Sequence, residues 1–152
     1  DELKAAGAEL TLELTEDSIV RSEDVAPILH RIRKLGVGIS IDDFGKGYSS
    51  LSYLREIPAT EVKIDKRFVT GAATDERDRH IVAAVVELAR AFGMRVVAEG
   101  VDNEESLEAV AKLGCDAIQG FYVARPMRAG LIPDFTVQFN RDAARLASRR
   151  SR

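Results

Sequence analysis

The chain has 152 residues, of which 45% are hydrophobic and 31% are charged, a composition typical of one globular domain with a buried core. Its 25 acidic and 22 basic residues leave a net charge of −3, which excludes a strongly basic nucleic-acid binder, so no nucleic-acid polymer is an expected partner. Cys115 is the single cysteine, which excludes an intrachain disulfide. The longest apolar run covers only residues 81–86, which is too short for a membrane-spanning helix. Both observations predict a cytoplasmic protein.

Along the chain, short apolar or alternating runs take turns with segments whose apolar residues recur at helical spacing. The predicted strands are residues 8–14, 37–41, 61–64, 95–98 and 116–118. The predicted helices are residues 22–35, 49–57, 75–92, 103–113 and 141–148. This alternation predicts an α/β protein with a parallel sheet and helices packed outside it. A doubly wound sheet and most of a (β/α) barrel share the pattern, which leaves both open.

The C-terminal residues differ in charge from the rest of the chain. Between Arg141 and Arg152 there are five arginines and one aspartate, which predicts a basic helix or tail over residues 136–152. Residues 1–135 are then the α/β domain.

The stretch at residues 37–51, VGISIDDFGKGYSSL, joins an apolar strand to two adjacent carboxylates and a turn with two glycines. Neighbouring side chains on a strand point to opposite faces, so we expect one carboxylate of Asp42 and Asp43 to point inward and the other to lie near the strand end. Gly45 and Gly47 permit backbone turns that other residues avoid. The alternative is that one aspartate only caps the helix that begins near Ser49.

Polar side chains stand at the C-terminal end of every predicted strand, where parallel sheets and barrels place their active sites. They are Glu13, Asp42, Asp43, Lys63, Asp65, Glu99 and Gln119. Carboxylates crowded in this way favour hard divalent ions such as Mg²⁺ or Mn²⁺, and two such ions can activate a water for displacement at phosphorus. Lys63 would stabilise phosphate charge or help to position that water. The alternative is a strand-end salt bridge between Lys63 and Asp65 or a neighbouring carboxylate.

Five segments in a fixed order carry a resemblance to a known family: ELTE (13–16), IDDFGKGYSSL (41–51), VKIDKRFV (62–69), VVAEGV (96–101) and GCDAIQGFYVARP (114–126). In this order they resemble the cyclic-di-GMP phosphodiesterase domain called the EAL domain, from Leu10 to Pro126. The family's fold is a modified TIM barrel. The resemblance therefore implies that residues 1–135 are the C-terminal portion of an EAL barrel, an incomplete (β/α) TIM-type barrel with about five βα units present.

The resemblance also implies a role for each matching residue. Glu13, Asp42 and Glu99 would be metal ligands at the catalytic centre, and Asp43 would serve a second metal, so the expected cofactor is a pair of Mg²⁺ or Mn²⁺ ions. Lys63 would contact the catalytic water, and Gln119 would complete the inner shell around water or metal. Glu16 would be the acid that holds the loop at residues 44–47. Asp65 would be the supporting acid of the substrate site, and Pro126 would form its guanine-side wall.

The implied function is hydrolysis of cyclic-di-GMP to the linear dinucleotide pGpG in bacterial second-messenger signalling. The Glu-Ala-Leu segment and the Asn-bearing strand that precede ELTE in the family are absent from this chain, so we expect it to be inactive alone. The alternative is a non-catalytic module that binds cyclic-di-GMP or a partner protein.

The loop and helix from Phe44 to Ile57 match the family's dimerisation element, so the resemblance implies a homodimer. It also implies that sensor or GGDEF domains can stand upstream. Lys46 occupies the position where the family usually has threonine. Because this loop couples dimerisation to metal binding in the family, we expect Lys46 to affect regulation more than chemistry.

Overall fold

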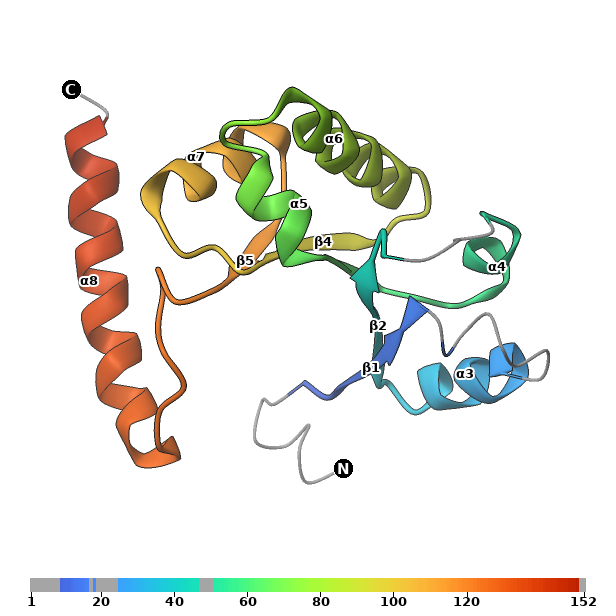
Figure 1. Cartoon of the computed structure of the whole chain (residues 1–152). Coiled ribbons are helices and arrows are strands. Elements are labelled where there is room, and N and C mark those ends of the chain that lie inside the picture. Colours follow the sequence, from blue (N-terminus) through green and yellow to red (C-terminus); the bar gives the residue numbers. More distant parts are fainter. Residues whose placement is uncertain (1–8, 17, 19–24, 47–50, 151–152) are drawn as a thin grey trace.

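Five parallel strands in chain order form the sheet of the protein (Figure 1). The computed structural model describes residues 9–16, 18, 25–46 and 51–150. The strands are β1 (Thr11–Thr15), β2 (Gly38–Phe44), β3 (Glu61–Ile64), β4 (Arg95–Glu99) and β5 (Ala117–Gln119). The predicted α/β class and parallel sheet are confirmed. Strand β3 has the predicted bounds, whereas β2 runs on through Asp42 and Asp43, which we had expected at its end.

Helices follow the strands, as the helical spacing predicted. They are α3 (Val25–Lys34), α4 (Leu51–Glu56), α5 (Lys66–Gly71), α6 (Glu76–Ala91), α7 (Glu104–Leu113), the 3₁₀ turn η1 (Ala129–Leu131) and α8 (Ile132–Arg150). The predicted helix starts at Ser22 and Ser49 lie outside the described residues. Asn103 caps α7 by accepting a hydrogen bond from the amide of Ser106 over 2.8 Å, and Gly114 ends it with a φ of 89°, which glycine adopts without strain.

Two helices differ from the prediction. Helix α5 was missed, because six residues are too few to show an apolar period. Helix α8 begins at Ile132 and not at Arg141. Proline is tolerated in the first helical turn, so Pro133 does not delay the helix. The stacked rings of Phe135 and Phe139, 5.7 Å apart, lie one turn from each other on it.

The two faces of the sheet differ in polarity, because side chains alternate along each strand. Buried apolar side chains pack with the helices in the core, and on the strands they are Ile39, Ile41, Val62, Ile64, Val96 and Ala98. The positions between them on β2 and β3 are the polar residues Ser40 and Lys63, whereas β4 has Val97 there and turns polar at Glu99. Register places Glu13 beside Ser40, and Glu99 beside Gln119. The strand-end polar groups therefore share the face opposite the apolar core.

The strand order explains which architecture the chain adopts. Strands β1 to β5 follow one another without a reversal, as in a (β/α) barrel, whereas a doubly wound sheet reverses its order at a switch point. In the described part of the chain β1 and β5 are the two sheet edges and do not pair with each other, so the barrel is not closed. The prediction of an incomplete parallel barrel is confirmed.

The C-terminal helix crosses the domain boundary that the charge pattern suggested. Helix α8 is continuous from Ile132 to Arg150, and Figure 1 shows it at the left of the view, set apart from β5. The division at residue 135 stays a prediction. Across the described ranges, every helix is too short or too polar to cross a lipid bilayer.

Candidate metal centre

Lys63 lies at the centre of the polar groups on the sheet. Its ammonium nitrogen is 2.6 Å from Oε1 of Glu99, 3.1 Å from Oε1 of Glu13 and 3.3 Å from Oδ1 of Asp42. The Lys63 side chain is only 6% exposed. Three strands, β1, β2 and β4, thus direct a carboxylate to one buried cation on β3.

The surroundings of Lys63 determine its charge. Burial alone would lower the pKa of its ammonium group, but hydrogen bonds to Glu99 and Glu13 and the nearby charge of Asp42 outweigh burial and raise that pKa above its ordinary value. Lys63 therefore stays charged and keeps the three carboxylates together. The sequence suggested that Lys63 pairs either with Asp65 or with a neighbouring carboxylate. The pairing with neighbouring carboxylates is present. In the part of the chain that the structure describes, Lys63 does not pair with Asp65, whose carboxylate pairs with Lys46 and Arg67 instead.

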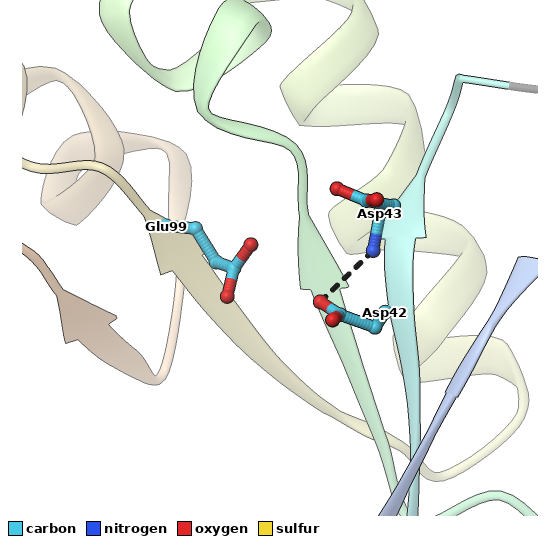
Figure 2. A group of neighbouring side chains, drawn as sticks. All are labelled: Asp42, Asp43 and Glu99. Carbon is cyan, nitrogen blue, oxygen red and sulfur yellow. Dashed lines mark hydrogen bonds between the residues drawn. The ribbon is translucent and has the colours of Figure 1, made fainter.

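A β-bulge brings the two adjacent aspartates of β2 to the same place. Ile41 pairs with Val62 and Phe44 with Ile64, so two residues of β2 stand opposite the single residue Lys63. Asp43 has a φ of 57°, and its amide donates a hydrogen bond to Oδ1 of Asp42 over 3.0 Å (Figure 2). From strand alternation we expected one carboxylate to point inward and the other to lie near the strand end. In the structure both carboxylates approach Glu99, because side-chain alternation is interrupted at a bulge.

Three carboxylates converge closely enough to share one cation. Asp42, Asp43 and Glu99 each offer an oxygen, and these oxygens all lie within 4.8 Å of one another. Figure 2 shows them on the ends of β2 and β4. All-oxygen donors of this kind suit Mg²⁺, Mn²⁺ or Ca²⁺, and the ammonium of Lys63 is already paired with two of them. The residues present therefore fit a divalent cation.

Glu13 lies beside this triplet but contributes differently. Its carboxylate is 53% exposed and contacts Lys63, while the group of oxygens close enough to share an ion in the described part of the chain consists of Asp42, Asp43 and Glu99. Glu13 is thus tied to the triplet through the lysine.

Glu16 holds the start of the loop after β2. Its side chain is buried, and Oε2 accepts a hydrogen bond from the amide of Gly45 over 3.0 Å. Gly45 has a φ of +98°, and a Cβ at this position would lie 2.8 Å from Cε2 of Phe68. Only glycine fits this backbone conformation and this space without strain. The loop therefore begins between Glu16 on one side and Phe68 on the other.

Asp65 is a buried acid with several donors. Its carboxylate accepts from the amide of Arg67 over 2.8 Å and from Nε of Arg67 over 3.1 Å, and Oδ2 is 2.8 Å from the ammonium of Lys46. Burial would raise its pKa, but the bonds from Lys46 and Arg67 outweigh burial and lower that pKa to about 2. Asp65 also caps helix α5.

Sequence reasoning missed the contacts of Lys46. Its ammonium pairs with Asp43 as well as with Asp65. No local spacing signals the contact between Lys46 and Asp65, because helix α4 and strand β3 separate these two residues along the chain. The tertiary fold alone brings these residues together.

Gln119 and Pro126 lie at the β5 side of the site. Gln119 ends β5 in register with Glu99, and its carbonyl accepts from the amide of Val101 over 3.1 Å. Its side chain is exposed, as is Pro126 in the segment beyond. Within the described ranges, neither residue makes a hydrogen bond to the carboxylate triplet. Their predicted roles toward water and nucleotide stay predictions.

Comparisons with known proteins find relatives of this chain in both sequence and fold. The family model described as EAL domain matches residues 1–126. The chain is 49% identical over 121 residues, 79% of its length, to the bifunctional diguanylate cyclase/cyclic di-GMP phosphodiesterase MucR of Pseudomonas aeruginosa, and covers 18% of that protein. A solved structure described as the PaMucR phosphodiesterase in complex with c-di-GMP is similar with a TM-score of 0.77 and 46% identity, over 86% of this chain and 54% of the other.

A second solved structure bears on the metal. It is described as a manganese/cy-diGMP complex of Klebsiella pneumoniae BlrP1 at pH 9.0, and it matches with a TM-score of 0.74 and 35% identity, over 83% of this chain and 33% of that one. The chain spans less than a fifth of the length of the first curated relatives that it matches.

Proposed function

The chain belongs to the EAL domain family, and from this premise we propose that it forms part of a phosphodiesterase site that hydrolyses cyclic-di-GMP to linear pGpG. The observation that carries the proposal is the group of Asp42, Asp43 and Glu99 within 4.8 Å, with the buried Lys63 against it. The relatives support the same substrate, since MucR is named a cyclic di-GMP phosphodiesterase and the PaMucR structure is a c-di-GMP complex.

The proposed cofactor is Mg²⁺ or Mn²⁺ at a two-metal site. Asp42, Asp43 and Glu99 would hold the metal, and Glu13, which already contacts Lys63, is the proposed further ligand. A bound divalent ion supplies a water of lowered pKa and neutralises phosphate charge. The manganese complex of BlrP1 supports the choice of ion.

Lys63 is proposed to act on the reacting groups directly. Its raised pKa keeps the ammonium charged at neutral pH, and a charged donor fixed by three carboxylates is oriented before the substrate arrives. It can donate to a phosphate oxygen or to the attacking water. Gln119 is proposed as a further donor to water or metal at the end of β5.

The remaining assignments concern support and the nucleotide. Glu16 is proposed to hold the loop after β2, which its hydrogen bond to Gly45 supports. Asp65 is proposed as the supporting acid of the substrate site, and Pro126 as a wall beside guanine. A homodimer through residues 44–57, GGDEF or sensor domains upstream and a cytoplasmic location complete the proposal.

A binding module without hydrolysis is the second candidate. Lys63 and Lys46 between them pair with every carboxylate of the triplet, so the protein itself offsets part of the negative charge that a metal would otherwise balance. Such a site can offer donors to a cyclic dinucleotide without activating water.

The test of the proposal is to incubate the 152-residue chain with cyclic-di-GMP and Mg²⁺ or Mn²⁺, measuring binding heat and linear product together. Glu99→Gln removes a charge from the triplet, and Glu108→Gln on the exposed face of α7 is the matched control. Metal-dependent product that Glu99→Gln abolishes and Glu108→Gln preserves supports the enzyme. Binding without product is the result expected of this chain alone and supports the binding module for these 152 residues. Turnover that survives Glu99→Gln contradicts the ligand assignment.

A further inference from the structure

Lys46 lies between two carboxylates from different parts of the fold. Its ammonium is 2.8 Å from Oδ2 of Asp65, at the start of α5, and is also hydrogen-bonded to Oδ1 of Asp43 on the bulge of β2. Asp65 is buried, with 2% of its side chain exposed, whereas the Lys46 side chain is 45% exposed and the Asp43 side chain 37% exposed. Lys46 therefore joins the metal triplet to a fixed, buried acid.

The two lysines at the site pair with different carboxylates of the triplet. Lys63 pairs with Asp42 and Glu99, and Lys46 pairs with Asp43. Lys63 is held in the interior, while Lys46 has access to solvent along a flexible four-carbon stem. Of the two ammonium groups, that of Lys46 is the one that can leave its carboxylate readily.

We propose that Lys46 is a tethered counter-ion that competes with a divalent metal for Asp43 and so lowers the metal affinity of the site. A cation that draws on all three carboxylates must displace this ammonium from Asp43. The displaced ammonium can stay paired with Asp65, so displacement breaks one ion pair and not two. This inference rests on the proposed function, since it assumes that the triplet binds metal.

The expected size of the effect follows from the exposure of the pair. A partly exposed ion pair changes an equilibrium by a factor of about two to five, and repulsion between an ammonium and a nearby dication adds to it. Replacement of Lys46 by a neutral residue should therefore lower the Kd for Mn²⁺ by about three- to tenfold.

The experiment is a Mn²⁺ titration of the full 152-residue chain, followed by calorimetry and by the loss of the free Mn²⁺ paramagnetic resonance signal. Lys46→Met and Lys46→Gln both remove the charge, and far-ultraviolet circular dichroism checks that each variant is folded. Lys112→Met is the matched control, because Lys112 also pairs with a carboxylate, Glu108, on the exposed face of α7.

A second arm tests whether the effect acts through Asp43. In the Asp43→Asn background the carboxylate for which Lys46 competes is gone. Lys46→Met should then change the Mn²⁺ affinity by less than about twofold, against the three- to tenfold gain expected in the parent chain.

The outcomes separate this inference from the proposed function. Tighter Mn²⁺ binding in both Lys46 variants, unchanged binding in Lys112→Met and no gain in the Asp43→Asn background support the inference. Equal affinity of parent and Lys46 variants, or weaker binding in the variants, overturns it while leaving the metal site intact. Absence of Mn²⁺ binding in the parent and in every variant overturns the metal site, and with it both proposals.

Discussion

The amide of Asp43 donates a hydrogen bond to Oδ1 of Asp42 over 3.0 Å, and the carboxylates of these two neighbouring residues both approach Glu99. The bulge opposite Lys63 and the φ of 57° at Asp43 make this possible. Asparagine, aspartate and glycine tolerate that backbone conformation better than other residues. The geometry of the candidate metal centre therefore depends on a local exception to strand structure.

Two substitutions of Asp43 can distinguish the effect of its backbone conformation on stability from the effect of its carboxylate on metal binding. We expect Asp43→Gly to be more stable than Asp43→Ala by about 1 kcal/mol, because only glycine takes a positive φ without steric strain. Both variants lack the carboxylate, so both should lose the same fraction of Mn²⁺ affinity. Urea unfolding and Mn²⁺ titration measure the two quantities. Equal stability of the two variants would show that the bulge is not formed in solution.

Removal of Lys63 should leave three carboxylates without their shared cation. We expect Lys63→Met to lower the free energy of unfolding by about 2 kcal/mol in the absence of metal, because loss of one partner leaves buried charges unpaired. This is less than for fully buried pairs, since the Glu13 partner is 53% exposed. Mn²⁺ should restore part of the loss. Lys112→Met, with its exposed pair, should change stability by less than about 0.5 kcal/mol.

Asp65 should make stability depend on acid pH. Its pKa is lowered from 3.8 to about 2 in the folded chain, so the folded state binds this proton less tightly than the unfolded state. The stabilisation is complete above about pH 4 to 5 and is lost as pH falls toward about 2. With the exposure of Lys46 taken into account, it should amount to about 1–2 kcal/mol at neutral pH.

The measurement is urea unfolding of the parent and Asp65→Asn between pH 7 and pH 3. The difference in unfolding free energy should shrink as pH falls. Asp75→Asn is the matched control, because Asp75 caps α6 through the same kind of bond to an amide, that of Arg77, and asparagine caps nearly as well. A difference between parent and Asp65→Asn that does not change with pH would contradict the assigned pKa shift.

Gly45 should tolerate substitution less well than another glycine of positive φ. Gly45→Ala meets both the backbone strain and Cε2 of Phe68 at 2.8 Å, whereas Gly93→Ala has a φ of +69° and nothing within 4 Å of the added carbon. We expect Gly93→Ala to lose about 1 kcal/mol and Gly45→Ala about 2–4 kcal/mol. Thermal or urea unfolding compares them directly. Losses of equal size would show that the ring of Phe68 does not lie against Gly45.

Much of the fold could be predicted because its signals are local. The apolar run at Glu61–Ile64 and the caps of α7, Asn103 and Gly114, lie within a few residues of the structure that they specify. Helix α5 was missed since six residues carry no period. The start of α8 was predicted too late because Pro133, which would break the interior of a helix, lies in its first turn, where proline is tolerated.

The sequence by itself determined the chemistry of the site. Alternation along parallel strands puts the strand-end acids and Lys63 on one face, and parallel pairing brings their strand ends to one edge. The tertiary structure decided which groups touch. Only strand register creates the bulge that brings both Asp42 and Asp43 toward Glu99, and only the tertiary fold joins Lys46 to Asp65 at the start of α5. These contacts depend on non-local pairing, which no spacing along the chain encodes.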